Sequence, residues 1–301
     1  MESLLGFISQ GLIYAILAFG IYITYKILDF PDLTVDGSFP LGAAITASLL
    51  TKNIHPVVAI LVSVIAGVVA GICTGIIHVK LKVRDLLSGI IMMTALYSIN
   101  LWIAGKSNIP LYNGVTLLFD EPYVINPIFD QLPVAIQPFK QVIILFCITF
   151  LLKFLLDAYL QTKSGFLLRA VGDNETLVTS LAKDKGIVKI IGLAIANGLV
   201  ALSGSIMAQQ FGYFDISMGT GTMVIGLASV IMGINLFTGF KKVKPTTAVI
   251  VGAVLYQGAW ALAIRLGLKT TYMRLVTAML LLVFLVISMK RNRKVKRDAR
   301  A

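Results

Sequence analysis

The feature that most constrains this chain is a series of apolar runs that recur along its whole length. Each run is about 17–25 residues long, the length at which an α-helix crosses the hydrocarbon core of a bilayer. Only 13% of the 301 residues are charged, too few to cover the surface of a soluble domain of this size. No run shows the alternation of a membrane β-strand. We therefore predict an all-α, polytopic membrane protein with one transmembrane domain over residues 1–301.

We expect about nine transmembrane or re-entrant segments in this domain. They are 4–27, 37–51, 56–79, 86–105, 141–160, 188–210, 218–236, 245–266 and 272–290. The segment 37–51 is short and contains Gly37 and Pro40. It can therefore either cross the membrane fully or form a re-entrant segment.

Basic residues predict the orientation. The tail over 290–301, KRNRKVKRDARA, is strongly basic, and cytoplasmic loops carry an excess of Lys and Arg. When this tail lies in the cytoplasm, nine segments place most of the 26 Lys and Arg residues on the same side and the N-terminus outside. A re-entrant segment at 37–51 would move the N-terminus inside. The net charge of +12 then reflects topology, and we expect no nucleic-acid partner.

Two short stretches echo each other. Residues 32–38, DLTVDGS, resemble residues 215–221, DISMGTG, and each stretch follows one apolar span and opens another. In our orientation the two copies face opposite sides, so residues 1–105 and 188–290 are candidate inverted repeats with broken helices. Such repeats are typical of transporters, and their breaks lie at the transport pathway. A chance match is the alternative for so short a pattern.

Polar side chains at the breaks or inside the spans mark the candidate pathway, because such groups usually face a cavity or a partner helix. The residues are Thr34, Asp36 and Ser38 at the first break, Tyr97 and Asn100 on the fourth span, and Asn197 on the sixth. Hydrogen bonding between helices is the alternative role for each of them. A pocket built from Asp36, Tyr97 and Asn100 would suit an amphipathic or amino-bearing solute.

The sequence contains no catalytic constellation and no cluster of metal ligands. The stretch GTGT at 219–222 lacks the Gly-Lys-Ser/Thr of a phosphate-binding loop. We therefore predict a chain that is not an enzyme, holds no metal and binds no cofactor.

A charged segment lies between two apolar runs over 164–204. Asp173 and Asn174 can cap a helix, and Gly186 can end it. Leu177, Val178 and Leu181 would form an apolar stripe on this helix. We predict a cytoplasmic helix over 173–185 that either lies in the membrane interface or inserts its stripe into a groove on a partner.

The same segment carries a family resemblance. Arg169-Ala170, Asp173-Asn174, Leu181 and Gly186-Ile187, followed by a span with Asn197, Gly198 and Gly204, resemble the permease subunits of bacterial ATP-binding-cassette importers of the branched-chain amino acid and ribose type. The stretch 34–39, TVDGSF, most resembles a less characterised branch, some members of which are associated with aromatic amino acid uptake. The resemblance covers nearly the full chain.

The resemblance implies a multi-pass subunit of the bacterial cytoplasmic membrane with several partners. These are a second copy of the permease, a cytoplasmic ATPase dimer that binds ATP and Mg²⁺, an extracellular solute-binding lipoprotein and a small solute. The segment 173–185 would be the coupling helix, and the contact with the ATPase would involve Arg169, Asp173, Asn174, Leu177, Val178, Leu181 and Gly186. An ion-coupled secondary transporter is the alternative, with Asp36 as its lone candidate acid.

Overall fold

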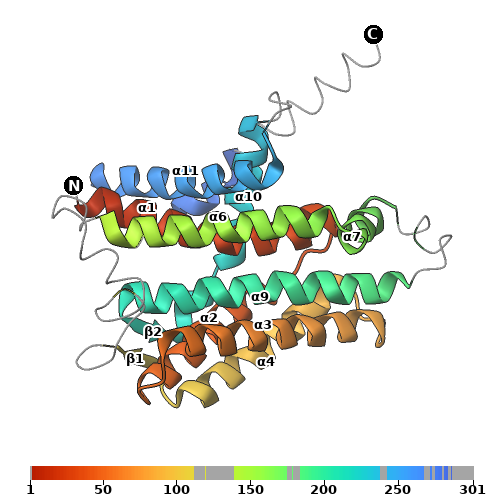
Figure 1. Cartoon of the computed structure of the whole chain (residues 1–301), viewed down its shortest axis with the longest axis horizontal. Helices are drawn as coiled ribbons and strands as arrows, with labels where there is room; N and C mark the ends of the chain where they lie inside the picture. The colour runs from red at the N-terminus through yellow and green to blue at the C-terminus, as the bar shows by residue number, and fades with distance from the viewer. Residues whose placement is uncertain are drawn as a thin grey trace, which may run out of the picture.

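The computed structural model describes residues 2–111, 119, 139–174, 178, 184–237, 243–267, 272, 275–279, 281–283 and 286. Long helices run side by side through these residues (Figure 1). The helices are α1 (Glu2–Ile21), α2 (Val35–Leu50), α3 (Pro56–Val79), α4 (Asp85–Ala104), α6 (Lys140–Leu160), α7 (Lys163–Asp173), α9 (Lys185–Phe211), α10 (Thr222–Phe237) and α11 (Pro245–Arg265). The shorter elements are the helical turns η1 (Tyr22–Ile27) and η3 (Ile216–Gly219) and the strands β1 (Asn108–Pro110) and β2 (Tyr213–Asp215).

The helices confirm a polytopic all-α membrane protein. Seven of the described helices are long and apolar enough to cross a bilayer, and α2 is a shorter apolar helix. These eight match the first eight expected segments. The ninth, 272–290, lies largely outside the described residues, so the count of nine stays a prediction.

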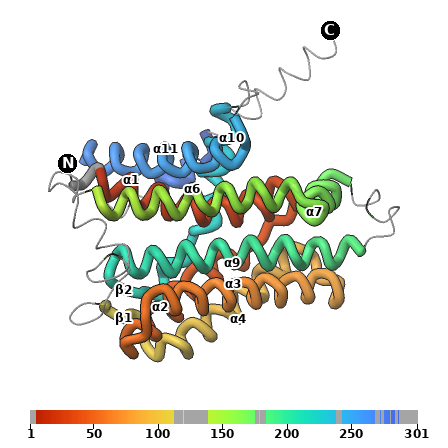
Figure 2. Tube along the Cα trace, in the orientation of Figure 1, coloured from red at the N-terminus to blue at the C-terminus, as the bar shows by residue number. Residues whose placement is uncertain are grey.

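The bundle has two groups of helices. In Figures 1 and 2, α2, α3, α4 and α9 form one group, and α1, α6, α10 and α11 form the other. Within the groups, α3 packs along α9 and α11 packs along α1, while α1 also contacts α9 and so joins the groups. We call one end of the bundle the α7 end and the opposite end, with β1 and β2, the ribbon end.

Small and hydroxylated residues let α2 approach α9 closely. A Cβ on Gly204 would overlap the backbone carbonyl of Phe39. Seven residues further along α2, the Thr46 hydroxyl lies 2.6 Å from the Ser205 hydroxyl and 2.9 Å from that of Ser63 on α3. Packing of this kind stabilises helices in a bilayer, where the hydrophobic effect does not drive their association.

Both echoed stretches interrupt the helices in the same local way. Asp32 accepts a hydrogen bond from the backbone N–H of Thr34 at 2.9 Å, and Asp215 accepts one from that of Ser217 at 2.8 Å. The Ser217 hydroxyl also donates to Asp215 and, despite partial burial, holds the pKa of that carboxyl below its ordinary value. Each aspartate thus shapes the turn that precedes a short helix, α2 or η3.

The ribbon of β1 and β2 was not expected from the sequence. Asn108 pairs with Asp215 and Pro110 with Tyr213 in antiparallel register. Strands of three residues are too short to show a recognisable alternation of polar and apolar side chains. The ribbon ties the segment after α4 to the end of α9.

The boundaries of the charged segment differ from our expectation. Asp173 ends α7 and Asn174 is its extended C-cap, whereas both were expected to begin a helix. Gly186 lies in the first turn of α9, whose N-cap is Asp184, because the Asp184 carboxylate accepts from the Gly186 N–H at 2.8 Å. Most of the predicted helix 173–185 lies outside the described residues.

Candidate functional site

The two breaks meet at Asp36, in the first turn of α2. Its carboxylate accepts hydrogen bonds from the backbone N–H groups of Gly221 at 3.1 Å and Met223 at 2.7 Å, and from the Thr222 hydroxyl at 2.9 Å. A negative charge at a helix N-terminus is favourable, so Asp36 caps α10 from the opposite half of the chain. The carboxylate therefore fixes the two breaks against each other.

A second set of polar groups holds the first break against α9. Asn197 donates to the Asp32 carboxylate at 2.8 Å and accepts from the Ser38 hydroxyl at 2.7 Å. The Thr34 hydroxyl lies 2.9 Å from that of Thr74 on α3. All five side chains are buried, and each has a partner. Since Asn197 lies near the middle of α9, the break lies about halfway along the bundle.

A cavity of about 390 Å³ opens beside the meeting point of the breaks. It lies between α2, α4 and the η3 connection, and its volume falls in the range of small-molecule sites. Its polar lining includes Asp36, Asn100 and Thr220, and its apolar lining includes Met93, Ile216 and the ring of Tyr97. One cavity therefore presents both polar groups and an aromatic surface.

Asn100, which borders this cavity, has a buried acceptor without a partner. Its amide nitrogen donates to the Gly37 carbonyl at 3.0 Å, which fixes the side chain. Its Oδ1 has no hydrogen-bond partner among the described residues, although the side chain is fully buried. A buried acceptor without a partner is costly, so a further donor at this point of the cavity wall would be favourable.

The structure separates the predicted pathway residues into two sets. Asp36, Tyr97 and Asn100 line the cavity. These are the three residues that the sequence suggested for a solute pocket. Thr34, Ser38 and Asn197 lie in the buried network instead. They therefore have the alternative role, hydrogen bonding between helices.

Two further residues were missed as site residues. Asp32 is buried at the start of the first break, and the Thr222 hydroxyl donates to Asp36. The echo of 32–38 and 215–221 contained a signal for Asp32, because each copy begins with aspartate.

The residues expected to contact an ATPase are spread over the α7 end. Arg169, Asp173 and Asn174 are exposed, and the Arg169 guanidinium donates to the Leu160 carbonyl at 3.1 Å. Val178 is fully buried in the protein's own core, so it does not present the expected surface stripe. Gly186 is also buried, against Val79, and Leu177 and Leu181 lie outside the described residues.

The tip of α7 packs against the end of η1, just before the first break. A Cβ on Gly172 would overlap the backbone carbonyl of Ile27, at the end of η1. From there only the short segment 28–34 leads to α2. The α7 end is thus in direct contact with the chain that leads to the cavity.

An ion cluster joins α6 to the start of α11. Asp157 lies 3.3 Å from the Lys153 ammonium and 3.2 Å from that of Lys244, and it accepts from the Thr246 hydroxyl at 2.7 Å. The pair four residues apart on α6 is thus part of a contact between helices. Both oxygens of the Asp157 carboxylate have a donor, which suits a structural role in holding α6 against α11.

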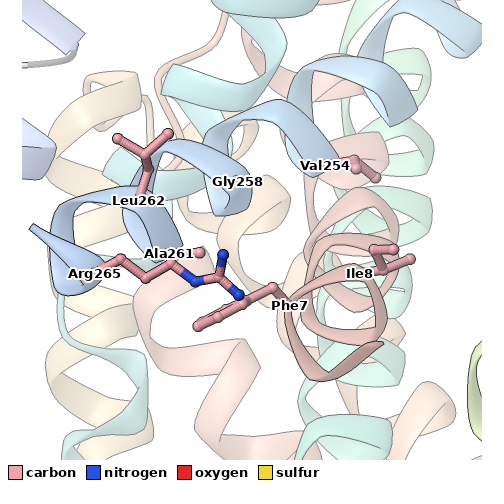
Figure 3. Close-up of a pocket in the computed structure, with 7 residues that line it drawn as sticks. All are labelled: Phe7, Ile8, Val254, Gly258, Ala261, Leu262 and Arg265. Carbon is pink, nitrogen blue, oxygen red and sulfur yellow. The ribbon is translucent and has the colours of Figure 1, made fainter. Parts of the chain in front are cut away.

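A smaller cavity of about 200 Å³ lies between α1 and α11 at the ribbon end (Figure 3). Its lining includes Phe7, Leu262 and Arg265, and Figure 3 shows the Arg265 guanidinium beside the Phe7 ring. It contains none of the predicted pathway residues.

Comparisons with known proteins agree with these features. Residues 3–286 match the family described as branched-chain amino acid transport system / permease component. A tyrosine transport system permease protein of Clostridioides difficile (strain R20291) is 46% identical over 285 residues, 95% of this chain and 91% of the relative. An uncharacterized protein of Rickettsia prowazekii (strain Madrid E) is 32% identical over 291 residues, 95% of this chain and 97% of the relative. No solved structure matches the chain. The chain therefore belongs to the family of branched-chain amino acid transport permease components, which are membrane subunits of ATP-binding-cassette importers.

Proposed function

We propose that two copies of this chain form the pathway of an importer for aromatic amino acids, with tyrosine as the first solute to test. The name of the 46% identical relative supports this substrate, and family membership does not favour an ion-coupled secondary transporter. A solute-binding lipoprotein would deliver the amino acid, and a separate ATPase dimer would bind ATP and Mg²⁺.

The lining of the cavity supports this substrate, because it combines the polar side chains of Asp36 and Asn100 with the ring of Tyr97. The ammonium group of an amino acid can donate to the oxygens of such polar side chains. The Tyr97 ring and the neighbouring Met93 and Ile216 supply apolar surface for an aromatic side chain. One amphipathic solute thus satisfies both parts of the lining.

The proposed orientation places the α7 end in the cytoplasm. Basic side chains gather at this end. They include Lys80, Lys82, Arg84, Lys163, Arg169, Lys185, Lys189 and Lys244. The ribbon end, with the N-terminus, would then face the binding protein.

We also propose that residues 1–105 and 188–290 are inverted repeats. In support, Asp32 and Asp215 each accept a hydrogen bond from the backbone N–H of the residue two positions later. The packing is also reciprocal, because α3 packs on α9 and α11 packs on α1. An inverted pair of breaks that meets at Asp36 suits alternating access around a central site.

The coupling route would run from α7 to the cavity. The ATPase would press on the exposed surface of α7 and the predicted coupling helix 173–185. The tip of α7 would transmit this motion through Ile27 to the segment that contains Asp32, and then to α2. Arg169, Asp173 and Asn174 are exposed where such a contact would form.

The variant Gly172→Val tests this route. Its side chain would force α7 away from Ile27, and overpacking of this kind costs roughly 1–3 kcal/mol. We expect ATP-driven uptake in proteoliposomes to fall about tenfold while the ATPase stays bound. Gly258→Val is the matched control, because a Cβ there meets no atom within 4 Å. Equal uptake by both variants would remove α7 from the route.

The proposed function is tested by reconstitution. The permease, its ATPase and its binding protein are placed in liposomes, and uptake of labelled tyrosine and leucine is compared. We expect uptake that requires ATP, persists with an uncoupler and favours tyrosine. Uptake by the permease alone, driven by an ion gradient, would establish the secondary transporter instead. A preference for leucine would refute the aromatic substrate.

A further inference from the structure

A separate basic cavity of about 530 Å³ lies at the α7 end. It is formed by the loop between α3 and α4 and by the start of α9, away from the solute cavity. Four cationic side chains line it, Lys82, Arg84, Lys185 and Lys189, against two acidic ones, Asp85 and Asp184. The Asp184 carboxylate already caps α9. The cavity therefore favours an anionic ligand.

His78 orients one of these cations. Its Nδ1 donates to the Val83 carbonyl at 2.9 Å, which leaves Nε2 to accept from the Lys189 ammonium at 3.5 Å. The ring of Phe30 packs edge-on against the imidazole, with the centroids 5.0 Å apart. The cavity wall is thus held by contacts with α9, the α3–α4 loop and the first break.

Exposed apolar residues lie next to the lining residues in the sequence. Leu81, 67% exposed, precedes Lys82; Ile187, 55% exposed, follows Gly186; and Leu87, 50% exposed, lies two positions after Asp85. At the end of membrane spans, such side chains are suited to contact acyl chains. A soluble anion would leave them in water.

We propose that this cavity binds the headgroup of an anionic membrane phospholipid, with its phosphate among Lys82, Arg84 and Lys189 and its acyl chains along the neighbouring apolar side chains. Basic pockets between transmembrane helices on the cytoplasmic side suit such headgroups. In the proposed orientation the lipid would belong to the inner leaflet. The site is independent of which solute is transported.

The test is native mass spectrometry of the full-length permease with phosphatidylglycerol or phosphatidylethanolamine. The variant is Lys82→Gln/Arg84→Gln, two exposed loop positions. Each cation near an anionic lipid contributes about 1 kcal/mol, or about fivefold, so we expect roughly thirtyfold weaker retention of phosphatidylglycerol. Lys52→Gln/Lys106→Gln, two exposed cations at the ribbon end, is the control and should retain the lipid as the parent does.

Three outcomes would overturn the proposal. The first is equal retention of the anionic and the zwitterionic lipid by the parent protein. The second is displacement of phosphatidylglycerol by inorganic phosphate at constant ionic strength, which would identify a soluble anion. The third is unchanged lipid retention by Lys82→Gln/Arg84→Gln together with lost binding of the ATPase, which would identify a protein contact.

Discussion

Replacing Asp36 by Asn is expected to abolish most ATP-driven uptake. The change keeps the size of the side chain but removes its charge, and the new amide nitrogen must face donors on Gly221, Thr222 or Met223. Hydrogen bonds to a charged group contribute about 1.5–3 kcal/mol each. A loss of about 3 kcal/mol from the state in which the breaks meet corresponds to roughly hundredfold slower uptake in proteoliposomes.

Asp29→Asn is the matched control for this prediction. Asp29 is exposed, lies seven positions before Asp36 in the connection between η1 and α2, and has a positive φ of 51°, which Asn tolerates well. We expect Asp29→Asn to transport as the parent does. Uptake by Asp36→Asn within about twofold of the parent would show that the cap on α10 is not needed for transport.

Replacing Asn197 by Leu is expected to destabilise the whole protein. The side chain keeps its approximate volume, but the buried Asp32 carboxylate loses a donor at 2.8 Å and the Ser38 hydroxyl loses its acceptor at 2.7 Å. Leaving a buried charge with too few partners costs about 3 kcal/mol. The measurement is the Tm of the detergent-solubilised protein, which should fall by roughly 5–10 °C.

The control for Asn197 is Asn108→Leu. Asn108 also donates to an aspartate, the Oδ2 of Asp215 at 3.2 Å, but this bond is exposed at the ribbon end. Exposed interactions of this type contribute about 1 kcal/mol or less. If Tm fell as far for Asn108→Leu as for Asn197→Leu, the buried network would not contribute more to stability than the exposed bond.

The spans were predictable because a bilayer imposes one length on every apolar helix. The segment 37–51 was the difficult case, and α2 is indeed short and starts near the middle of the bundle, beside Asn197. Its boundary depends on Asp32, Asp36 and their distant partners. Local sequence patterns do not contain such partners, so neither the capping of α10 nor the strand pairing at β1 was predictable.

The candidate site was predictable in part. Asp36, Tyr97 and Asn100 were identified as polar groups near or within apolar spans, where such groups are costly unless they serve a purpose. Sequence alone did not show which of these groups line a cavity and which bond to neighbouring helices. The partner of Ser38 lies 159 residues away, and the three partners of Asp36 lie at least 185 residues away. The predicted helix start at Asp173 differs from the structure, because Asp173 is the last residue of α7.

If the cavity beside Asp36 lies on the path of an aromatic amino acid, two aromatic residues of α4 should affect transport differently. Tyr97 lines the cavity, whereas Trp102 is 83% exposed and does not. Both can be replaced by Ala in the reconstituted importer, and ATP-driven tyrosine uptake is measured. Loss of an aromatic contact of about 1.5 kcal/mol predicts roughly tenfold slower uptake for Tyr97→Ala. Trp102→Ala should leave uptake unchanged. Parent-like uptake by Tyr97→Ala, or an equal loss in both variants, would show that the cavity does not lie on the path of the solute.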